Sequence, residues 1–169
     1  PGERIVVELK EGGGLDSEVE ARYRLRLAGR HLNRALAFVA DEAYDDSVGK
    51  AQLSVENSVK AIIACFRIPS WSHDPSSELE EVVATNRDAI VKLFGEGYLD
   101  KIMEACQAAA KLGPEHGKTT YGDVISYKPP WEMYDRSKAE EAVALAGKAF
   151  EVAKSFVERW FKLSTCRCA

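Results

Sequence analysis

The sequence is poor in the features that mark secreted and membrane proteins. Its four cysteines are too few and too scattered for a disulfide framework, standing at Cys65, Cys106, Cys166 and Cys168. No apolar run approaches the roughly 18 to 20 residues that cross a bilayer, and the first residues show no basic-then-apolar signal segment. We therefore expect a cytoplasmic protein that does not enter the membrane.

The sequence also has no excess of positive charge. Its formal net charge of -4 argues against a surface built as a whole to bind nucleic acid, although a local basic patch is compatible with that total. What is present is the balance of one globular domain, with 46% apolar and 30% charged residues in a chain of 169. We assign residues 16–165 to that domain and residues 1–15 to an N-terminal arm. The arm is expected to be a short strand or a disordered segment, because a β-branched run precedes a triple glycine.

Apolar residues recur at three- and four-residue spacing over most of the domain, which is the pattern of amphipathic helices. The expected helices span about residues 17–44, 47–66, 75–94, 98–112 and 137–163. Glycines interrupt the chain before residue 98, so the segment that follows is either a fourth helix or a kinked continuation of the third. The stretch before the last helix, rich in Gly, Pro and aromatic residues, is expected to be a long loop over residues 113–135. These elements predict an all-α fold, an up-and-down bundle of four to five helices.

The second expected helix carries a face of small residues beside its apolar stripe. Ser54, Ser58, Ala61 and Cys65 share this face at helical spacing. Small side chains allow a neighbouring helix to approach closely, so we expect a tight helix pair here.

The clearest electrostatic feature is a ladder of arginines on the first expected helix. Arg22, Arg26, Arg30 and Arg34 follow one another at intervals of four, so they share one helix face. Such a row of guanidinium groups can form a strip that binds phosphates or nucleic acid. The alternative is an ordinary charged surface, since Glu18 stands four residues before Arg22 and can pair with it.

Glu56 and Lys60 form an i, i+4 pair in the favourable order in the middle of the second helix. The pattern by itself favours a surface salt bridge that contributes roughly a few tenths of a kcal/mol.

Arg67 and His73 flank a loop that contains Trp71, so their side chains could meet across it. An imidazole beside a guanidinium can act on a phosphodiester as general base and charge stabiliser. These two residues are the candidates for catalysis, although the pair alone does not assign an enzyme activity. The alternative for His73 is a hydrogen bond near the next helix, where Asp74 and Pro75 are expected to be N-cap and first helical residue.

Tyr121 and Asp123 lie in the expected long loop, where they either line a cleft or close the end of the bundle. Their surroundings lack the Gly-x-x-x-x-Gly-Lys spacing of a phosphate loop, and no hydrolase nucleophile motif or dinucleotide fingerprint appears elsewhere. The terminal Cys166 and Cys168 have neither a second close pair nor a nearby His. We therefore expect no metal site and no cofactor.

Three short motifs and their order resemble the HEPN domain family over about residues 28–157. They are Glu56-Asn57-x-x-Lys60-Ala61, Ser72-His73-Asp74 and Tyr121-Gly122-Asp123, followed by an Ala-rich last helix. The resemblance implies a compact helical bundle, often dimeric, associated with nucleotide binding and, in one large branch, with metal-independent RNA cleavage. In that branch an Arg and a His, four to six residues between them, stand near the start of the last large helix. Here that spacing falls between the second and third helices, so the chain is more similar to the non-nuclease members.

From the residues and the resemblance together we expect a homodimer that binds a nucleotide or another phosphate-containing ligand. The expected polar site comprises Glu56, Lys60, His73, Asp74, Tyr121 and Asp123. The family resemblance adds a nucleotidyltransferase as a candidate partner and RNA as a candidate ligand. Two alternatives stay open: a metal-independent RNase that uses Arg67 and His73, and a protein-interaction scaffold without a ligand.

Overall fold

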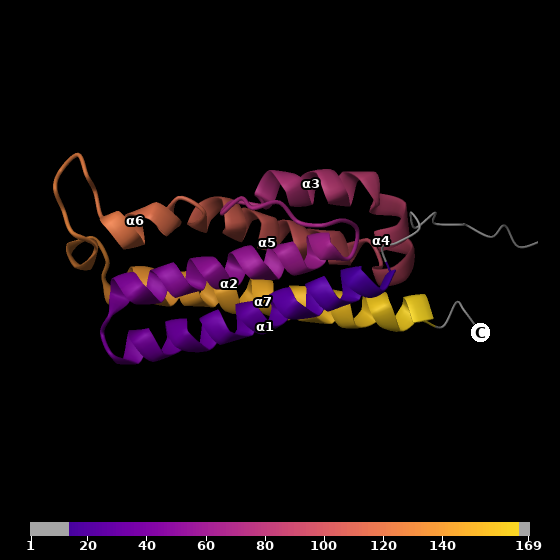
Figure 1. Cartoon of the computed structure of the whole chain (residues 1–169), viewed down its shortest axis with the longest axis horizontal. Helices are drawn as coiled ribbons and strands as arrows, with labels where there is room; N and C mark the ends of the chain where they lie inside the picture. The colour runs from indigo at the N-terminus through magenta and orange to yellow at the C-terminus, as the bar shows by residue number, and fades with distance from the viewer. Residues whose placement is uncertain (1–13, 166–169) are drawn as a thin grey trace, which may run out of the picture.

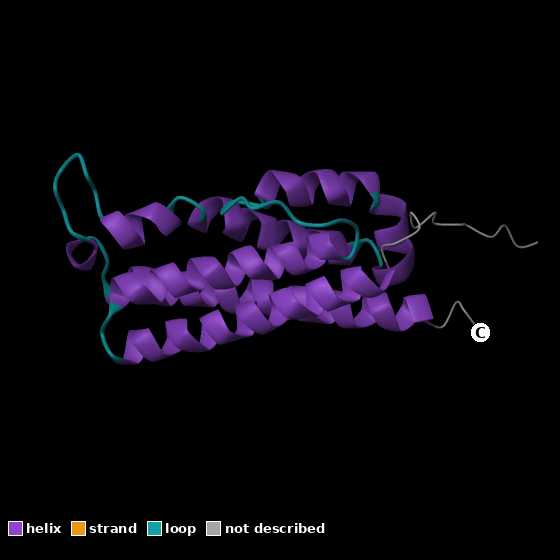
Figure 2. Ribbon diagram, viewed as in Figure 1, coloured by secondary structure: helices purple, strands orange, loops and turns teal. Residues whose placement is uncertain are grey.

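The computed structural model describes residues 14–165, and over these residues the protein consists of helices and has no β-strand (Figure 2). The expected N-terminal strand and the pair Cys166 and Cys168 lie outside the described residues. The helices are α1 (Gly14–Ala40), α2 (Tyr44–Ala64), α3 (Ser76–Thr85), α4 (Arg87–Phe94), α5 (Gly97–Leu112), α6 (Glu115–Tyr121) and α7 (Arg136–Thr165), with a 3₁₀ turn, η1 (Pro130–Glu132). The expectation of an all-α bundle is confirmed.

The helices α1, α2 and α7 lie side by side along the long axis of the molecule (Figure 1). α5 packs against α2 and α7, α6 follows it toward one end of the bundle, and α3 lies outside α5. The loop between α6 and η1 projects at that end. None of the helices between residues 14 and 165 is long and apolar enough to cross a membrane.

The structure corrects two of the expected elements. Residues 75–94 form α3 and α4 rather than one helix. They divide at Asn86, whose Nδ2 donates to the carbonyl of Val82 over 2.8 Å and so competes with the backbone. Residues 113–135 are not all loop, because α6 begins after Pro114, whose φ of -61° suits a helix start. That helix ends at Gly122, which has a φ of +73° and lies so close to Lys128 that a Cβ would be 2.2 Å from its carbonyl oxygen.

The helix α2 runs through the middle of the bundle and is buried over most of its length. Its contact with α1 is close, as expected from the small-residue face. Ser54 donates from Oγ to the carbonyl oxygen of Ala28 over 2.9 Å, and Ser47 does the same to Ala35. Ala28 and Ala35 are fully buried. A side chain that bonds the backbone of the facing helix requires the two helices to be near one another, and this close seam fixes α1 against α2.

We expect Ala28→Leu to lower the free energy of unfolding by about 1–3 kcal/mol, because the added methylenes have no room in the seam. Ala37→Leu is the matched control, since Ala37 is on the exposed side of α1 and should change stability by less than about 0.5 kcal/mol. Urea unfolding followed by circular dichroism measures both. Similar losses in the two variants would contradict a close α1–α2 contact.

Candidate functional site

The centre of the candidate site is an ion pair on α2. Lys60 donates from Nζ to Oε1 of Glu56 over 2.8 Å, and the two side chains are only 3% and 7% exposed. The helices α1, α3, α5, α6 and α7 all contact α2, which keeps this part of it away from water. The interpretation of Glu56 and Lys60 as a surface salt bridge is therefore wrong. A charged pair removed from water needs further hydrogen bonds to offset the cost of desolvation.

Gln52 and His73 supply those hydrogen bonds. The amide nitrogen of Gln52 donates to Oε2 of Glu56 over 3.0 Å and to the carbonyl oxygen of His73 over 3.1 Å. The Nδ1 atom of His73 lies 3.1 Å from the same carboxylate oxygen. Although burial raises the pKa of Glu56, the hydrogen bonds from Lys60, Gln52 and His73 outweigh it, so this pKa lies below its ordinary value. The carboxylate is thus held in its ionised form.

His116, from α6, completes the network. Its Nδ1 atom lies 3.2 Å from Oε1 of Gln52. Its ring stacks on that of His73, with 3.6 Å between the ring centroids and 14° between the planes. Burial, and then the charge of His73, lower the pKa of His116. The network therefore joins α2, the loop before α3, and α6.

The loop that carries His73 is held in place at its end next to α3. Asp74 accepts a hydrogen bond from the backbone N–H of Ser76 over 3.1 Å. The expected helix start is wrong by one residue, because Pro75 and not Asp74 is the N-cap of α3 and Ser76 is its first helical residue. Gly113, at the end of α5, lies so close that a Cβ there would be 2.8 Å from the Cβ of Asp74. Together with the bond from Gln52 to the His73 carbonyl, these contacts hold the imidazole over Glu56.

The structure brings together Glu56, Lys60 and His73, with Asp74 beside them, and places the other expected residues elsewhere. Arg67 pairs with Glu81 over 2.9 Å and with Glu78 over 3.4 Å, so the expected meeting of Arg67 with His73 does not occur.

Tyr121 and Asp123 belong to the end of the bundle rather than to the Glu56 network. Tyr121 is 76% exposed. The carboxylate of Asp123 accepts hydrogen bonds from Ile125 and Ser126, and its backbone pairs with that of Lys128. These bonds are those of a turn that closes the projecting loop, which was one of the two interpretations of the sequence.

Sequence reasoning missed Gln52 and His116. Gln52 stands four residues before Glu56, so helical spacing already places the two on one face of α2. His116 gave no comparable signal, because it lies in a segment that was expected to be loop. Its position follows from the close packing of α6 on α2. A Cβ added to Gly49 on α2 would be only 2.9 Å from the hydroxyl oxygen of Thr119 on α6, so only glycine fits there.

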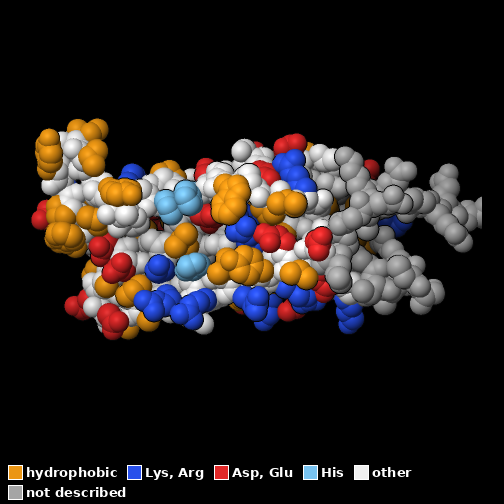
Figure 3. Space-filling view, viewed as in Figure 1, with side chains coloured by type: hydrophobic (Ala, Val, Ile, Leu, Met, Phe, Trp, Pro, Cys, Tyr) orange, Lys and Arg blue, Asp and Glu red, His pale blue; other side chains and the backbone are white. Residues whose placement is uncertain are grey.

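The arginine ladder occupies the solvent-facing side of α1, where Arg22, Arg26, Arg30 and Arg34 are all exposed. Figure 3 shows a row of Lys and Arg side chains along the edge formed by α1, on the same face of the molecule as the His side chains. Arg22 pairs with Glu18 over 2.7 Å, and Arg34 lies over the ring of Phe38. Among the described residues, Arg26 and Arg30 make no hydrogen bond or ion pair.

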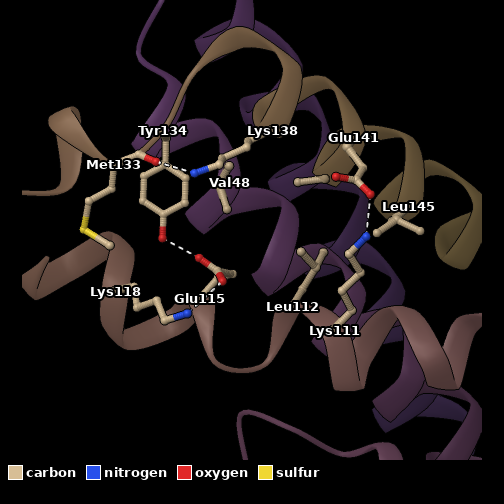
Figure 4. A pocket seen from close by; sticks show the side chains of 11 residues that line it. Val48, Lys111, Leu112, Glu115, Lys118, Met133, Tyr134, Lys138, Glu141 and Leu145 are labelled. Atoms are coloured by element: carbon tan, nitrogen blue, oxygen red, sulfur yellow. Dashed lines mark hydrogen bonds and ion pairs between the residues drawn. The ribbon is translucent and has the colours of Figure 1, made fainter. Parts of the chain in front are cut away.

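A separate cavity of about 190 Å³ lies between α2, α5, α6 and α7 (Figure 4). Its polar side chains are already paired: Tyr134 donates to Glu115, Lys111 pairs with Glu141, and Lys138 donates to the carbonyl oxygen of Met133. Burial, and then the Glu115 carboxylate, raise the pKa of Tyr134. Ligand pockets usually measure about 300–1,000 Å³, so this cavity is too small for a nucleotide.

Fold and site together define an all-α domain organised around a buried Glu–Lys pair, whose hydrogen bonds order a histidine-bearing loop. A family model of the HEPN domain matches residues 21–156. The chain therefore belongs to the HEPN family. Comparison with curated proteins and with solved structures found no significant match.

We expect Lys60→Met to lower the free energy of unfolding by about 3–5 kcal/mol at pH 7, because it leaves the Glu56 carboxylate buried without its cation. Urea unfolding measures the loss. The matched control is Arg22→Met, which breaks the exposed i, i+4 pair with Glu18 and should cost less than about 1 kcal/mol. A loss as small in Lys60→Met as in the control would show that the pair is not buried in solution.

Wild type and Lys60→Met are also expected to differ in how their free energy of unfolding depends on pH. In the wild type the folded pKa of Glu56 lies below the ordinary value of 4.5, so its contribution is present above that pH and is lost as the pH falls through the folded pKa. In Lys60→Met the carboxylate loses its cation and its pKa rises. The gap in unfolding free energy between wild type and variant should therefore narrow from pH 7 to pH 4, and a constant gap would contradict the pairing.

Proposed function

We propose that this HEPN protein binds a phosphate-containing ligand, such as a nucleotide, at the arginine strip of α1, defined as Arg22, Arg26, Arg30 and Arg34. The observation that supports the proposal is the exposure of all four side chains on one helix face. At a rise of 1.5 Å per residue the strip extends over about 18 Å. Guanidinium groups spaced in this way match the repeated oxygens of a polyphosphate or of a nucleic-acid backbone.

The middle of the strip is the part best prepared for an anion. Arg26 and Arg30 make no ion pair or hydrogen bond within residues 14–165, so a phosphate need not displace a carboxylate there. His31 lies beside this part of the strip. Its pKa is lowered by burial and then by the charge of Lys50, so cationic groups from both α1 and α2 border the region.

Lys60 does not touch the ligand in this proposal, because it is 3% exposed and its ammonium group is paired with Glu56. Its role is to keep Glu56 ionised and in place. The side chain of His73 is 54% exposed, so a ligand can reach it, whereas the Glu56 and Lys60 side chains are buried.

The RNase alternative is not favoured by the geometry. It needs an imidazole and a guanidinium at one phosphodiester, whereas Arg67 lies with Glu78 and Glu81 and His73 lies with Glu56.

The proposal is tested with ATP, GTP and a short labelled single-stranded RNA, each with and without magnesium, at two salt concentrations. We expect the double variant Arg26→Gln and Arg30→Gln to bind at least tenfold more weakly than wild type. For RNA the slope of log affinity against log salt should fall by about 1.4, since each phosphate contact contributes about 0.7 for single strands. Fluorescence anisotropy gives both quantities.

The matched control is the double variant Lys101→Gln and Lys148→Gln, which removes the same charge from α5 and α7, where these lysines border a second cavity, of about 340 Å³. Binding that is lost in this control and kept in the α1 variant would move the site to this second cavity and refute the proposal. The absence of binding in wild type would refute it as well. RNA recovered from the samples without metal is run on a gel, and cleavage that is lost with His73→Ala would favour the RNase alternative.

Self-association is a second candidate function, and the projecting loop favours it. Tyr121, Val124, Ile125, Tyr127 and Trp131 are between 70% and 90% exposed at this end of the bundle. Apolar side chains gathered on a surface usually mark a contact with another molecule. The family resemblance suggests a second copy of the chain as the occupant.

We expect wild type to behave as a dimer in size-exclusion chromatography with light scattering, and the double variant Ile125→Ser and Tyr127→Ser to be monomeric. The control variant, Ile68→Ser and Trp71→Ser, removes equally exposed apolar side chains from another loop and should stay dimeric. A monomeric wild type would refute the dimer and leave a partner nucleotidyltransferase as the occupant to test. A dimer that survives Ile125→Ser and Tyr127→Ser would place the interface elsewhere.

A further inference from the structure

Glu56, His73 and His116 offer one metal-ligating atom each, and these atoms lie within 4.8 Å of one another. They come from α2, from the loop before α3, and from α6, so the fold and not a sequence motif assembles them. We propose that these three side chains bind a divalent transition-metal ion of the zinc type. The proposal is independent of phosphate binding at α1, which uses none of these residues.

The distance between the groups fits a shared ion. The Nδ1 atom of His73 and Oε2 of Glu56 are 3.1 Å apart. Zinc lies about 2.0–2.2 Å from its nitrogen and oxygen ligands, so two ligands of one tetrahedral ion are about 3.3–3.6 Å apart, slightly more than this distance. In the absence of metal, Nδ1–H of His73 donates a hydrogen bond to Oε2 of Glu56. To ligate an ion, Nδ1 has to give up this proton and the ring has to carry its proton on Nε2, which leaves both atoms free to ligate.

The remaining partners of the carboxylate orient it for this role. Oε1 of Glu56 is occupied by Lys60, so Oε2 is the oxygen that faces the histidines. Gln52 donates to Oε2 and holds the His73 backbone, which places both ligands. Ligands of protein metal sites are typically held by hydrogen bonds of this kind. The Lys60 charge lowers the affinity for a cation, so we expect reversible binding rather than permanent occupancy.

His116 supplies the third ligand by turning out of the stack. The lone pair of an imidazole lies in its ring plane, so two rings only 14° from parallel cannot both point at one ion. His116 is only partly buried, and its recorded side-chain partners are Gln52 and the His73 ring, so turning the ring exchanges these two contacts for the metal.

The set of two imidazoles and one carboxylate selects the metal class. Imidazole suits zinc, copper, iron and nickel, whereas magnesium and calcium prefer sites made wholly of oxygen. Three protein ligands on zinc leave a fourth position for water or a bound molecule. Because the His73 side chain is 54% exposed, this open position faces the solvent side of the cluster.

The test is a titration of the full chain with Co²⁺, whose visible absorption reports coordination by protein ligands. The substitutions Cys166→Ser and Cys168→Ser are present throughout, so that terminal thiols do not compete for the metal. We expect one site per chain, without the near-ultraviolet band that thiolate ligands give, and displacement of Co²⁺ by Zn²⁺ with a rise in Tm. His73→Ala and His116→Ala should each weaken binding at least tenfold. His31→Ala, which removes the third histidine of the sequence, should bind as the parent does.

Circular dichroism verifies that each variant is folded, and the partial exposure of His73 and His116 makes their removal tolerable. Glu56 is left intact because its loss would leave Lys60 buried without a partner. Loss of binding in both cluster variants with retention in His31→Ala supports the site. Failure of the parent to bind Co²⁺, retention of binding in His73→Ala and His116→Ala, or a thiolate band that assigns the metal to Cys65 or Cys106 would each overturn it.

Discussion

The rest of the structure depends on one buried charge pair. Glu56 and Lys60 lie on α2, which α1, α3, α5, α6 and α7 all contact, and together they occupy a place where unpaired charge is not tolerated. The Glu56 carboxylate therefore needs several hydrogen-bond donors. Lys60 and Gln52 donate from neighbouring turns of α2, and His73 donates from the loop before α3. His73 is one of these donors, and its contact with the carboxylate holds the loop before α3 over α2. The ion pair thus links the interior of the bundle to an exposed histidine.

On α1, the residues that pack against the bundle and the residues of the proposed phosphate site lie on opposite sides of the helix. The inward side of α1 carries small residues such as Ala28 and Ala35 at the seam, which allow close approach to α2 and leave no room for ligand chemistry. Its outward side carries Arg26 and Arg30, which the fold does not use. A surface that contributes little to folding can change its charge without cost to the core, so the proposed phosphate site on α1 is compatible with the polar network on α2.

The helices could be predicted from sequence because their apolar spacing is a local property, and α2 and α7 lie within a few residues of their expected bounds. The division at Asn86 and the short helix α6 were missed, because a side-chain hydrogen bond ends one helix and α6 is too short to show a period. Burial of Glu56 could not be predicted either, since an i, i+4 Glu–Lys pair has the same spacing on a surface as in a core. His116 depends on how α6 packs on α2, and that is decided by contacts between residues far apart in the sequence.

Gln52 has a consequence for how this protein tolerates mutation. Its side chain is almost wholly buried, and both of its amide atoms are used in a fixed sense: the nitrogen donates to Glu56 and to the His73 carbonyl, while the oxygen faces His116. The direction of the amide cannot be reversed, because two acceptors would then meet. A change to Glu conserves the size and shape of the side chain and replaces an NH₂ group by an oxygen. It would place two carboxylates next to each other in the interior. Gln52→Glu, although it changes very few atoms, should therefore be among the most destabilising substitutions in this core.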